Sequence, residues 1–191
     1  MYQEYQNKLI EKLTQTQFSI DGHSILEFET GMETLVKLFS DAKRNGRQVF
    51  FIGNGGSSAI ASHMTADFMK NGGMKTYSLY DTAVSTCISN DYGYEFVFSK
   101  PLEFLLQEKD VLVAISSSGN SKSIVNAIDT AKHKKAIVVT FSGFLQENSI
   151  REMGNLNVYV PIEHYGIVES IHNLLLQQAV DMILEREGVW L

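Results

Sequence analysis

Two short stretches of this chain follow one plan: an apolar strand runs into a turn of glycine and serine, and the turn opens a helix. The first is Gln48–Ile52 followed by Gly53-Asn-Gly-Gly-Ser-Ser58, and the second is Asp110–Ile115 followed by Ser116-Ser-Ser-Gly-Asn-Ser121. A turn that leads into a helix presents free backbone N–H groups and hydroxyls to an anion. Two such turns in one domain predict a single pocket that holds a phosphate group and the polar molecule attached to it.

Strands and helices alternate along most of the chain. The expected strands are 48–52, 76–80, 110–115, 135–141 and 157–161. The expected helices are 2–20, 24–45, 57–70, 83–89, 94–107, 120–132, 145–153 and 166–187. The strands are continuous apolar runs, which is typical of strands buried on both faces. The pattern predicts an α/β fold, a three-layer sandwich with a five-stranded parallel sheet flanked by helices, plus two N-terminal helices.

Length and composition narrow the classes of protein. A chain of 191 residues without a break in composition predicts a single domain over 1–191. The formal net charge of -6 offers no basic surface for nucleic acid, so any bound anion must be held by local dipoles and hydroxyls. The single cysteine, Cys87, excludes an intrachain disulfide and fits a reducing compartment. The polar N-terminus and the strand-sized apolar runs predict a cytoplasmic protein without a membrane segment.

Each turn also has a plainer explanation. Ser118 or Ser121 could cap the helix that follows, and glycine-rich turns between a strand and a helix are common. Neither turn is a nucleotide-hydrolysing P-loop, because no Gly-Lys-Ser/Thr follows it. A third polar loop, with Asn90 and Asp91, joins two predicted helices and could either line the pocket or form an ordinary Asx turn.

Proton-transfer groups are expected on two helices. His63 and Asp67 stand four apart on the helix after the glycine turn, so they share a face and could act as acid and base, as metal ligands, or as a surface ion pair. On the last helix Glu169 and His172 share a face by their spacing of three, and Gln177 follows eight residues after Glu169. Polar side chains beside so apolar a helix face either form hydrogen bonds within the core or face a binding site.

The motifs Gly53-Asn-Gly-Gly-Ser57, Asn90-Asp-Tyr-Gly93 and Ser116-Ser-Ser-Gly-Asn-Ser121, in this order, resemble the sugar isomerase (SIS) domain, and within it the phosphoheptose isomerases. The likeness covers nearly the whole chain. It implies a flavodoxin-like fold, a homotetramer in which 1–46 serves oligomerisation, and a role in lipopolysaccharide or capsule heptose biosynthesis. It also implies contacts with the sugar phosphate from Asn54, Gly55, Gly56, Ser57, Asn90, Asp91, Ser116, Ser117, Ser118, Ser121 and Glu169.

The resemblance further implies a zinc ion, and here the chain departs from the family. His63 matches the first family ligand, whereas Asp67 stands where the family has Glu, Glu169 where it has Gln, and Gln177 where it has a second His. The family's Glu and second His form its acid/base pair, and Gln177 cannot titrate. The four positions still offer one nitrogen and three oxygens, a harder set of ligands than usual.

The leading hypothesis is therefore an isomerase that converts sedoheptulose 7-phosphate into glycero-manno-heptose 7-phosphate through an enediol. Its expected catalytic residues are Asp67, Glu169 and His172, with zinc held by His63, Asp67, Glu169 and Gln177. A second hypothesis keeps the isomerase and changes the sugar phosphate. A third is a non-catalytic sugar-phosphate-binding protein, like the SIS relatives that associate with a replication initiator.

Overall fold

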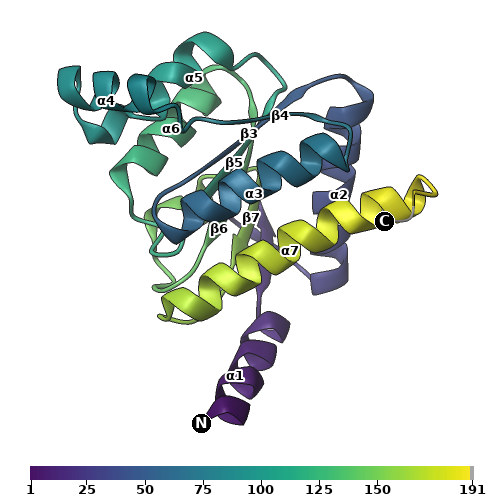
Figure 1. Cartoon of the computed structure of the whole chain (residues 1–191). Helices are drawn as coiled ribbons and strands as arrows, with labels where there is room; N and C mark the ends of the chain where they lie inside the picture. Colours follow the sequence, from purple (N-terminus) through teal and green to yellow (C-terminus); the bar gives the residue numbers. More distant parts are fainter. Residues whose placement is uncertain (190–191) are drawn as a thin grey trace.

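A sheet runs through the middle of the computed structural model, and residues 1–189, which the structure describes, contribute seven strands to it (Figure 1). The order across the sheet is β2-β1-β7-β6-β5-β3-β4. The strands are β1 (Gln17–Ile20), β2 (Ser24–Leu26), β3 (Gln48–Gly53), β4 (Lys75–Ser78), β5 (Val111–Ser116), β6 (Ile137–Ser142) and β7 (Leu156–Tyr159). The five strands β3 to β7 are parallel, as the apolar runs predict, and β1 and β2 join them antiparallel at one edge.

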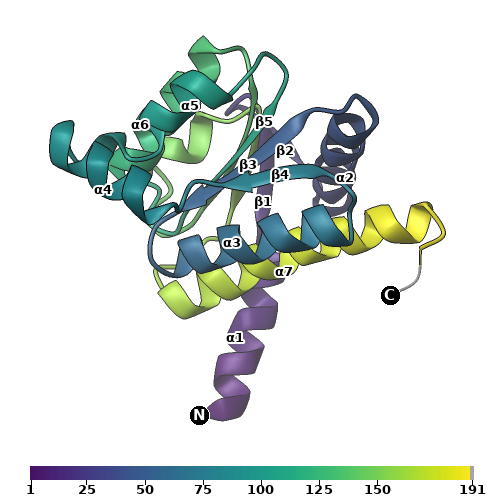
Figure 2. The same ribbon diagram turned by 45° about the horizontal axis from the view of Figure 1, so that its top comes forward.

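Helices cover both faces of the sheet (Figures 1 and 2). One face carries α2 (Phe28–Arg44), α3 (Gly56–Lys70) and α7 (Tyr165–Arg186), and the other carries α4 (Thr82–Asp91), α5 (Ser99–Leu105) and α6 (Lys122–His133). Short 3-10 helices, η1 (Tyr94–Phe96) and η2 (Ser149–Glu152), complete the chain. The predicted three-layer α/β sandwich is thus confirmed.

Side-chain alternation along the central strands divides the core into two parts. Phe51 and Val113 pack with α2, α3 and α7, whereas Phe50 and Leu112 pack with α5 and α6. Successive side chains of a strand point to opposite faces, so a strand covered on both sides must be apolar throughout. All four of these side chains are buried. The sheet is therefore a rigid platform for the loops at its carboxyl edge.

The N-terminal segment differs from the expectation of two helices and five strands. The helix expected over 2–20 ends early, as α1 (Tyr2–Thr14), and the chain continues as a hairpin of β1 and β2 before α2. Phe18 of β1 is fully buried and packs edge-on against Phe28 at a centroid distance of 5.5 Å. Burial of this ring against the sheet outweighs the helical periodicity of the segment. The helix expected over 94–107 is likewise divided, into η1 and α5.

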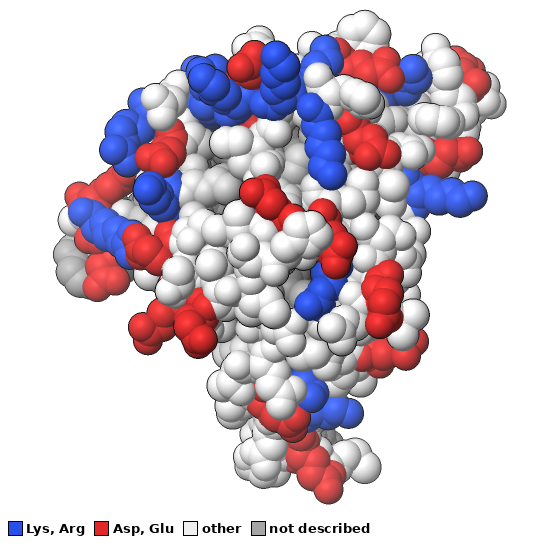
Figure 3. All heavy atoms as spheres, turned by 180° about the vertical axis from the view of Figure 1, so that it is seen from behind, with Lys and Arg blue, Asp and Glu red and all other residues white. Residues whose placement is uncertain are grey.

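The helix α1 projects away from the body of the protein (Figure 2), and none of its residues is buried. Seen from behind, acidic and basic side chains are intermixed on the surface (Figure 3). Across the described residues, the helices are too short or too polar to cross a bilayer.

Candidate functional site

A cavity of about 400 Å³ lies at the carboxyl ends of β3 and β5, where both predicted turns meet. The register of the sheet explains why they meet, because Gly53 of β3 lies opposite Ile115 of β5. The carboxyl edge of a parallel sheet is where open α/β folds bind their ligands. The cavity is lined by Asn54, Gly55, Gly56, Ser57, Ile115, Ser116, Ser117, Ser118, Ser121, Tyr165 and Glu169.

Two helices begin at this cavity without a capping side chain. Gly55 is the N-cap of α3 and Ser121 the N-cap of α6, and neither makes a side-chain capping bond. The hydroxyl of Ser117 is buried and has no hydrogen-bond partner among residues 1–189. Ser121 therefore does not act as the conventional cap that was the plainer alternative. Uncapped N-termini and a free hydroxyl leave donors available to an anion.

Tyrosine hydroxyls hold the glycine turn in place. The Tyr80 hydroxyl accepts from Gly53 N at 2.8 Å and donates to Gly53 O at 3.0 Å. Burial raises the pKa of Tyr80 above its ordinary value, so the hydroxyl keeps the proton that it donates. The Tyr94 hydroxyl donates to Asn54 Oδ1 at 2.6 Å, while Asn54 Nδ2 donates to Ser123 Oγ at 3.0 Å. The Asn54 amide is thus fixed from both ends before any ligand binds.

Glu169 brings a carboxylate into the cavity from α7. Its carboxyl group lies so close to Gly56 that a β-carbon at this glycine would overlap with it. Among the lining residues of the described chain, Glu169 is the only aspartate or glutamate. Tyr165, one turn earlier on α7, and Ile115 also line the cavity, and sequence reasoning missed both. The position of Tyr165 in the first turn of a helix that follows a parallel strand was the available signal.

His172 is not a catalytic residue in this structure, which corrects the expectation. The side chain has no exposed surface, its Nε2 lies 3.1 Å from Ser142 O, and the ring packs edge-on against Phe141. Burial lowers the pKa of His172 to about 4, so the ring is neutral at pH 7. The spacing of three that joins His172 to Glu169 does place both on one side of α7, but His172 faces the sheet while Glu169 reaches the cavity.

Three of the four expected zinc ligands, His63, Asp67 and Glu169, do not gather into a metal-binding group among residues 1–189. His63 Nε2 lies 3.5 Å from Asp67 Oδ2, and the His63 side chain is half exposed, which fits the alternative of a surface ion pair. Gln177 donates to Asp181 Oδ1 at 3.0 Å on α7. Nowhere in residues 1–189 do three His, Cys, Asp or Glu side chains gather closely enough to hold a metal ion. Zinc binding by these four residues therefore stays a prediction.

Asn90 and Asp91 do not line the cavity, contrary to the expectation. They lie exposed in the last turn of α4, where Asn90 Nδ2 donates to Asp91 Oδ1 at 2.9 Å. The contribution of this loop comes instead from Tyr94, three residues further on, through its hydrogen bond to Asn54.

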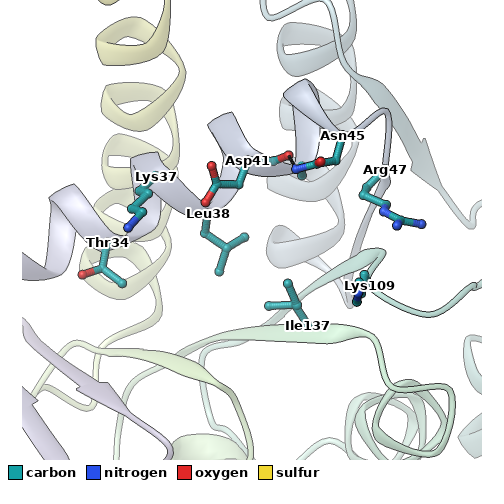
Figure 4. Close-up of a pocket in the computed structure, with 9 residues that line it drawn as sticks. Thr34, Lys37, Leu38, Asp41, Asn45, Arg47, Lys109 and Ile137 are labelled. Atoms are coloured by element: carbon teal, nitrogen blue, oxygen red, sulfur yellow. Dashed lines mark hydrogen bonds between the residues drawn. The ribbon is translucent and has the colours of Figure 1, made fainter.

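A second hollow, of about 470 Å³, lies at the opposite edge of the sheet, between α2 and the start of β6 (Figure 4). Leu38 and Ile137 approach its centre from the two sides, and its polar lining mixes Lys37 and Arg47 with Asp41. Asp41 is already paired with Arg44 at 3.0 Å. This hollow contains none of the turns or helix N-termini that define the first cavity.

Comparisons with known proteins agree with this geometry. The SIS domain family model matches residues 23–143. A phosphoheptose isomerase of Sodalis glossinidius is 32% identical over 198 residues, covering 99% of this chain and 98% of that protein. One of Campylobacter concisus is 35% identical over 78% of this chain and 84% of its own.

Solved structures of phosphoheptose isomerases have a similar fold. A phosphoheptose isomerase from Neisseria gonorrhoeae superposes with a TM-score of 0.74 at 30% identity, covering 81% of this chain and 85% of that one. One from Francisella tularensis reaches a TM-score of 0.83 at 23% identity over 96% of both chains, a likeness of fold.

Proposed function

We infer that this chain, which belongs to the phosphoheptose isomerase family of SIS-domain proteins, is an enzyme that interconverts a ketose phosphate and an aldose phosphate. The substrate that the family indicates is sedoheptulose 7-phosphate, with glycero-manno-heptose 7-phosphate as the product. The observation that carries the inference is the cavity at the carboxyl edge of the sheet, where the serine turn, the glycine turn and one carboxylate meet.

The two turns bind different parts of the substrate. The serine turn and the uncapped N-terminus of α6 offer hydroxyl and N–H donors to the phosphate group. The fixed amide of Asn54 and the hydroxyl of Tyr165 lie where the polar body of the sugar would extend. Because the protein carries a net charge of -6, these local donors must supply the attraction that its overall field does not.

Glu169 is the residue that we assign to proton transfer. Isomerisation through an enediol requires a base that takes the proton from C1 of the ketose and returns it to C2. A carboxylate on one side of the sugar can do both, and it must lie within hydrogen-bond reach of these carbons. Glu169 is the one carboxylate in the described lining of the cavity. Asp67, the other expected proton carrier, lies outside that lining next to His63 and stays a prediction.

The test is incubation of the purified protein with sedoheptulose 7-phosphate in D₂O, with NMR detection of the aldose and of deuterium at C2. We expect turnover by the wild type and a loss of about 10²-fold or more in kcat for Glu169→Gln, the range typical of a removed general base. Glu163→Gln makes the same change of charge at an exposed residue near the start of α7, outside the cavity lining, and should keep wild-type activity. Equal activity of both variants would refute the assignment of Glu169.

A non-catalytic role is the second candidate, and one observation favours it. The acid/base and metal positions of the family are changed at Asp67 and Gln177, and within residues 1–189 His63, Asp67 and Glu169 do not gather into a metal-binding group. A wild type that binds the sugar phosphate but gives no aldose and no deuterium exchange, with or without added zinc, would establish this candidate. Exchange with another ketose phosphate alone would keep the isomerase and change the substrate.

We also propose that the protein works in the cytoplasm as a homotetramer, with 1–46 contributing to assembly. Support comes from α1, which buries none of its residues while Tyr2 and Ile10 remain exposed. Thirteen residues are marginal for an isolated helix in water, so a partner surface would stabilise α1. Light scattering on the full chain and on a variant with Tyr2 and Ile10 replaced by serine tests the assembly.

A further inference from the structure

The connection between β6 and η2, residues 143–148, lies against the outer side of the serine turn. Asn148 in this connection is buried, and its Nδ2 donates to Leu145 O at 2.8 Å and to Gly143 O at 3.1 Å. The side chain thereby closes its own loop into a fixed shape. None of residues 143–148 lines the cavity, so the connection reaches a ligand only through the turn.

Backbone bonds from this region hold two carbonyl groups of the serine turn. Gly143 N donates to Ser117 O at 3.0 Å, and Ile150 N donates to Gly119 O at 3.0 Å. In a trans peptide the C=O and the following N–H point in opposite directions. With the Ser117 carbonyl turned toward the connection, the N–H group of Ser118, a residue that lines the cavity, is turned away from the connection. The N–H group of Asn120 donates instead to Ser118 Oγ at 3.4 Å, inside the turn itself.

Two asparagines complete the contact. Asn120 Oδ1 accepts from Ser149 N at 2.9 Å and from Ser149 Oγ at 2.8 Å. Gly119 has a φ of +67°, and a β-carbon added to it would lie 2.6 Å from Asn148 Cβ. Asn148 therefore packs closely on the backbone of the turn, and this position leaves room only for glycine.

The Asn148 amide is costly to keep in this position. Its Oδ1 is buried and has no hydrogen-bond partner among residues 1–189. A buried acceptor without a donor is unfavourable, and an apolar side chain would avoid it. What the amide supplies instead is the set of donated bonds, to Leu145 O, Gly143 O and, at 3.4 Å, Ser142 Oγ, that give the connection its shape.

We propose that Asn120 and Asn148, here called the asparagine clasp, are positioning residues that set the orientation of the serine turn for binding the phosphate group of the substrate. The clasp rests on the proposed function in that it serves the same cavity. It acts by holding donors in place before binding, so its loss weakens phosphate affinity without touching the proton-transfer step.

The experiment compares Asn120→Ala, Asn148→Ala and Ser149→Ala in the full-length protein. The control is Asn155→Ala, which removes one similar bond, from Val138 N to Asn155 Oδ1 at 2.9 Å, beyond η2 in the same β6–β7 connection. Measurements are KM and kcat for the sugar phosphate, the Kd of inorganic phosphate by calorimetry, and the melting temperature.

We expect Asn120→Ala and Asn148→Ala to raise KM and the phosphate Kd together, by about tenfold, with kcat within about twofold of the wild type. Ser149→Ala should raise both less, and the double variant of Asn120 and Ser149 should match Asn120→Ala, because the Ser149 hydroxyl acts through Asn120. The control should leave both constants unchanged.

Lower melting temperatures of the Asn120 and Asn148 variants with an unchanged phosphate Kd would show that the two residues only stabilise the fold, and would refute the proposal. A wild type with no measurable affinity for phosphate would refute it too. If Asn148→Ala does not fold, the Asn120 and Ser149 variants decide alone. A wild type that binds phosphate but turns over no sugar would count against the proposed reaction only, since the phosphate Kd still measures the clasp.

Discussion

The buried His172 should make the stability of the protein depend on pH in a way that one substitution removes. The ring bonds Ser142 O through Nε2, its Nδ1 has no partner within residues 1–189, and the largest cause of its lowered pKa is burial. Protonation would place an N–H at Nδ1 with no acceptor to receive it. The folded protein therefore resists taking up a proton that the unfolded chain accepts readily.

The magnitude follows from the two pKa values. The pKa falls from 6.5 to about 4 on folding, so the unfolded chain binds more protons between these values. The stabilisation is fully present above pH 6.5 and is lost as the pH falls toward 4. At about 1.4 kcal/mol per pKa unit, a change from pH 7.5 to pH 5 removes about 2 kcal/mol of unfolding free energy.

Urea unfolding of the wild type and of His172→Gln, at both pH values and one protein concentration, measures this term. Glutamine keeps an N–H donor for Ser142 O but does not titrate, so the wild type should lose about 2 kcal/mol more than the variant between pH 7.5 and pH 5. His133→Gln, a change at an exposed histidine of α6, should behave like the wild type. The same pH dependence in the wild type and in His172→Gln would refute the reasoning.

Other substitutions test the supports of the sheet and of the cavity. Tyr80→Phe leaves Gly53 N and O without their hydroxyl partner and should cost about 1–3 kcal/mol in urea unfolding, with weaker ligand binding; unchanged stability would contradict the role of the hydroxyl. Gly31→Ala places a β-carbon 2.5 Å from Phe18 Cβ and should lower the free energy of unfolding by about 1–3 kcal/mol in the same assay. An unchanged free energy of unfolding would show that the β1–β2 hairpin moves aside and would contradict this expectation. Asp110→Asn replaces one of the two carboxylate oxygens that accept from Gln48 N and Gln107 N by an amide nitrogen, which cannot accept; we expect a lower melting temperature at pH 7, and an unchanged one would contradict the role of these two bonds.

The parallel sheet could be predicted because its strands are unbroken apolar runs, a pattern that burial on both faces imposes. The hairpin of β1 and β2 was missed because 2–20 and 24–45 were each predicted as one continuous helix. A better signal was present in Asp21-Gly22, where both residues have positive φ, as the tight turn of a hairpin requires. Local turn chemistry outweighed periodicity in this segment.

The cavity was predictable to the extent that its parts come from turns. Backbone donors follow directly from a strand, a turn and a helix in sequence, so the glycine and serine turns were placed correctly. The positions of the α7 side chains were harder to predict. Spacing shows which residues share a face of the helix, but not whether that face packs on the sheet or lines the cavity. Glu169 reaches the cavity, whereas His172, one turn later, is enclosed beside Phe141. Distances between helices, which decide whether Asp67 and Gln177 can meet, are not encoded in any local pattern.

The antiparallel edge of the sheet has a consequence for the order of folding. β1 pairs with β7, so Ile20 meets Leu156, a residue near the other end of the chain. Asn157 Nδ2 also donates to Ser19 O at 3.3 Å. Contacts that close so long a loop form late and slow the folding rate. During synthesis from the N-terminus, the β1–β2 hairpin must wait for β7 to emerge from the ribosome, with the Phe18 ring exposed in the meantime. The nascent chain would thus be most vulnerable to aggregation through its own first residues, long after they were made.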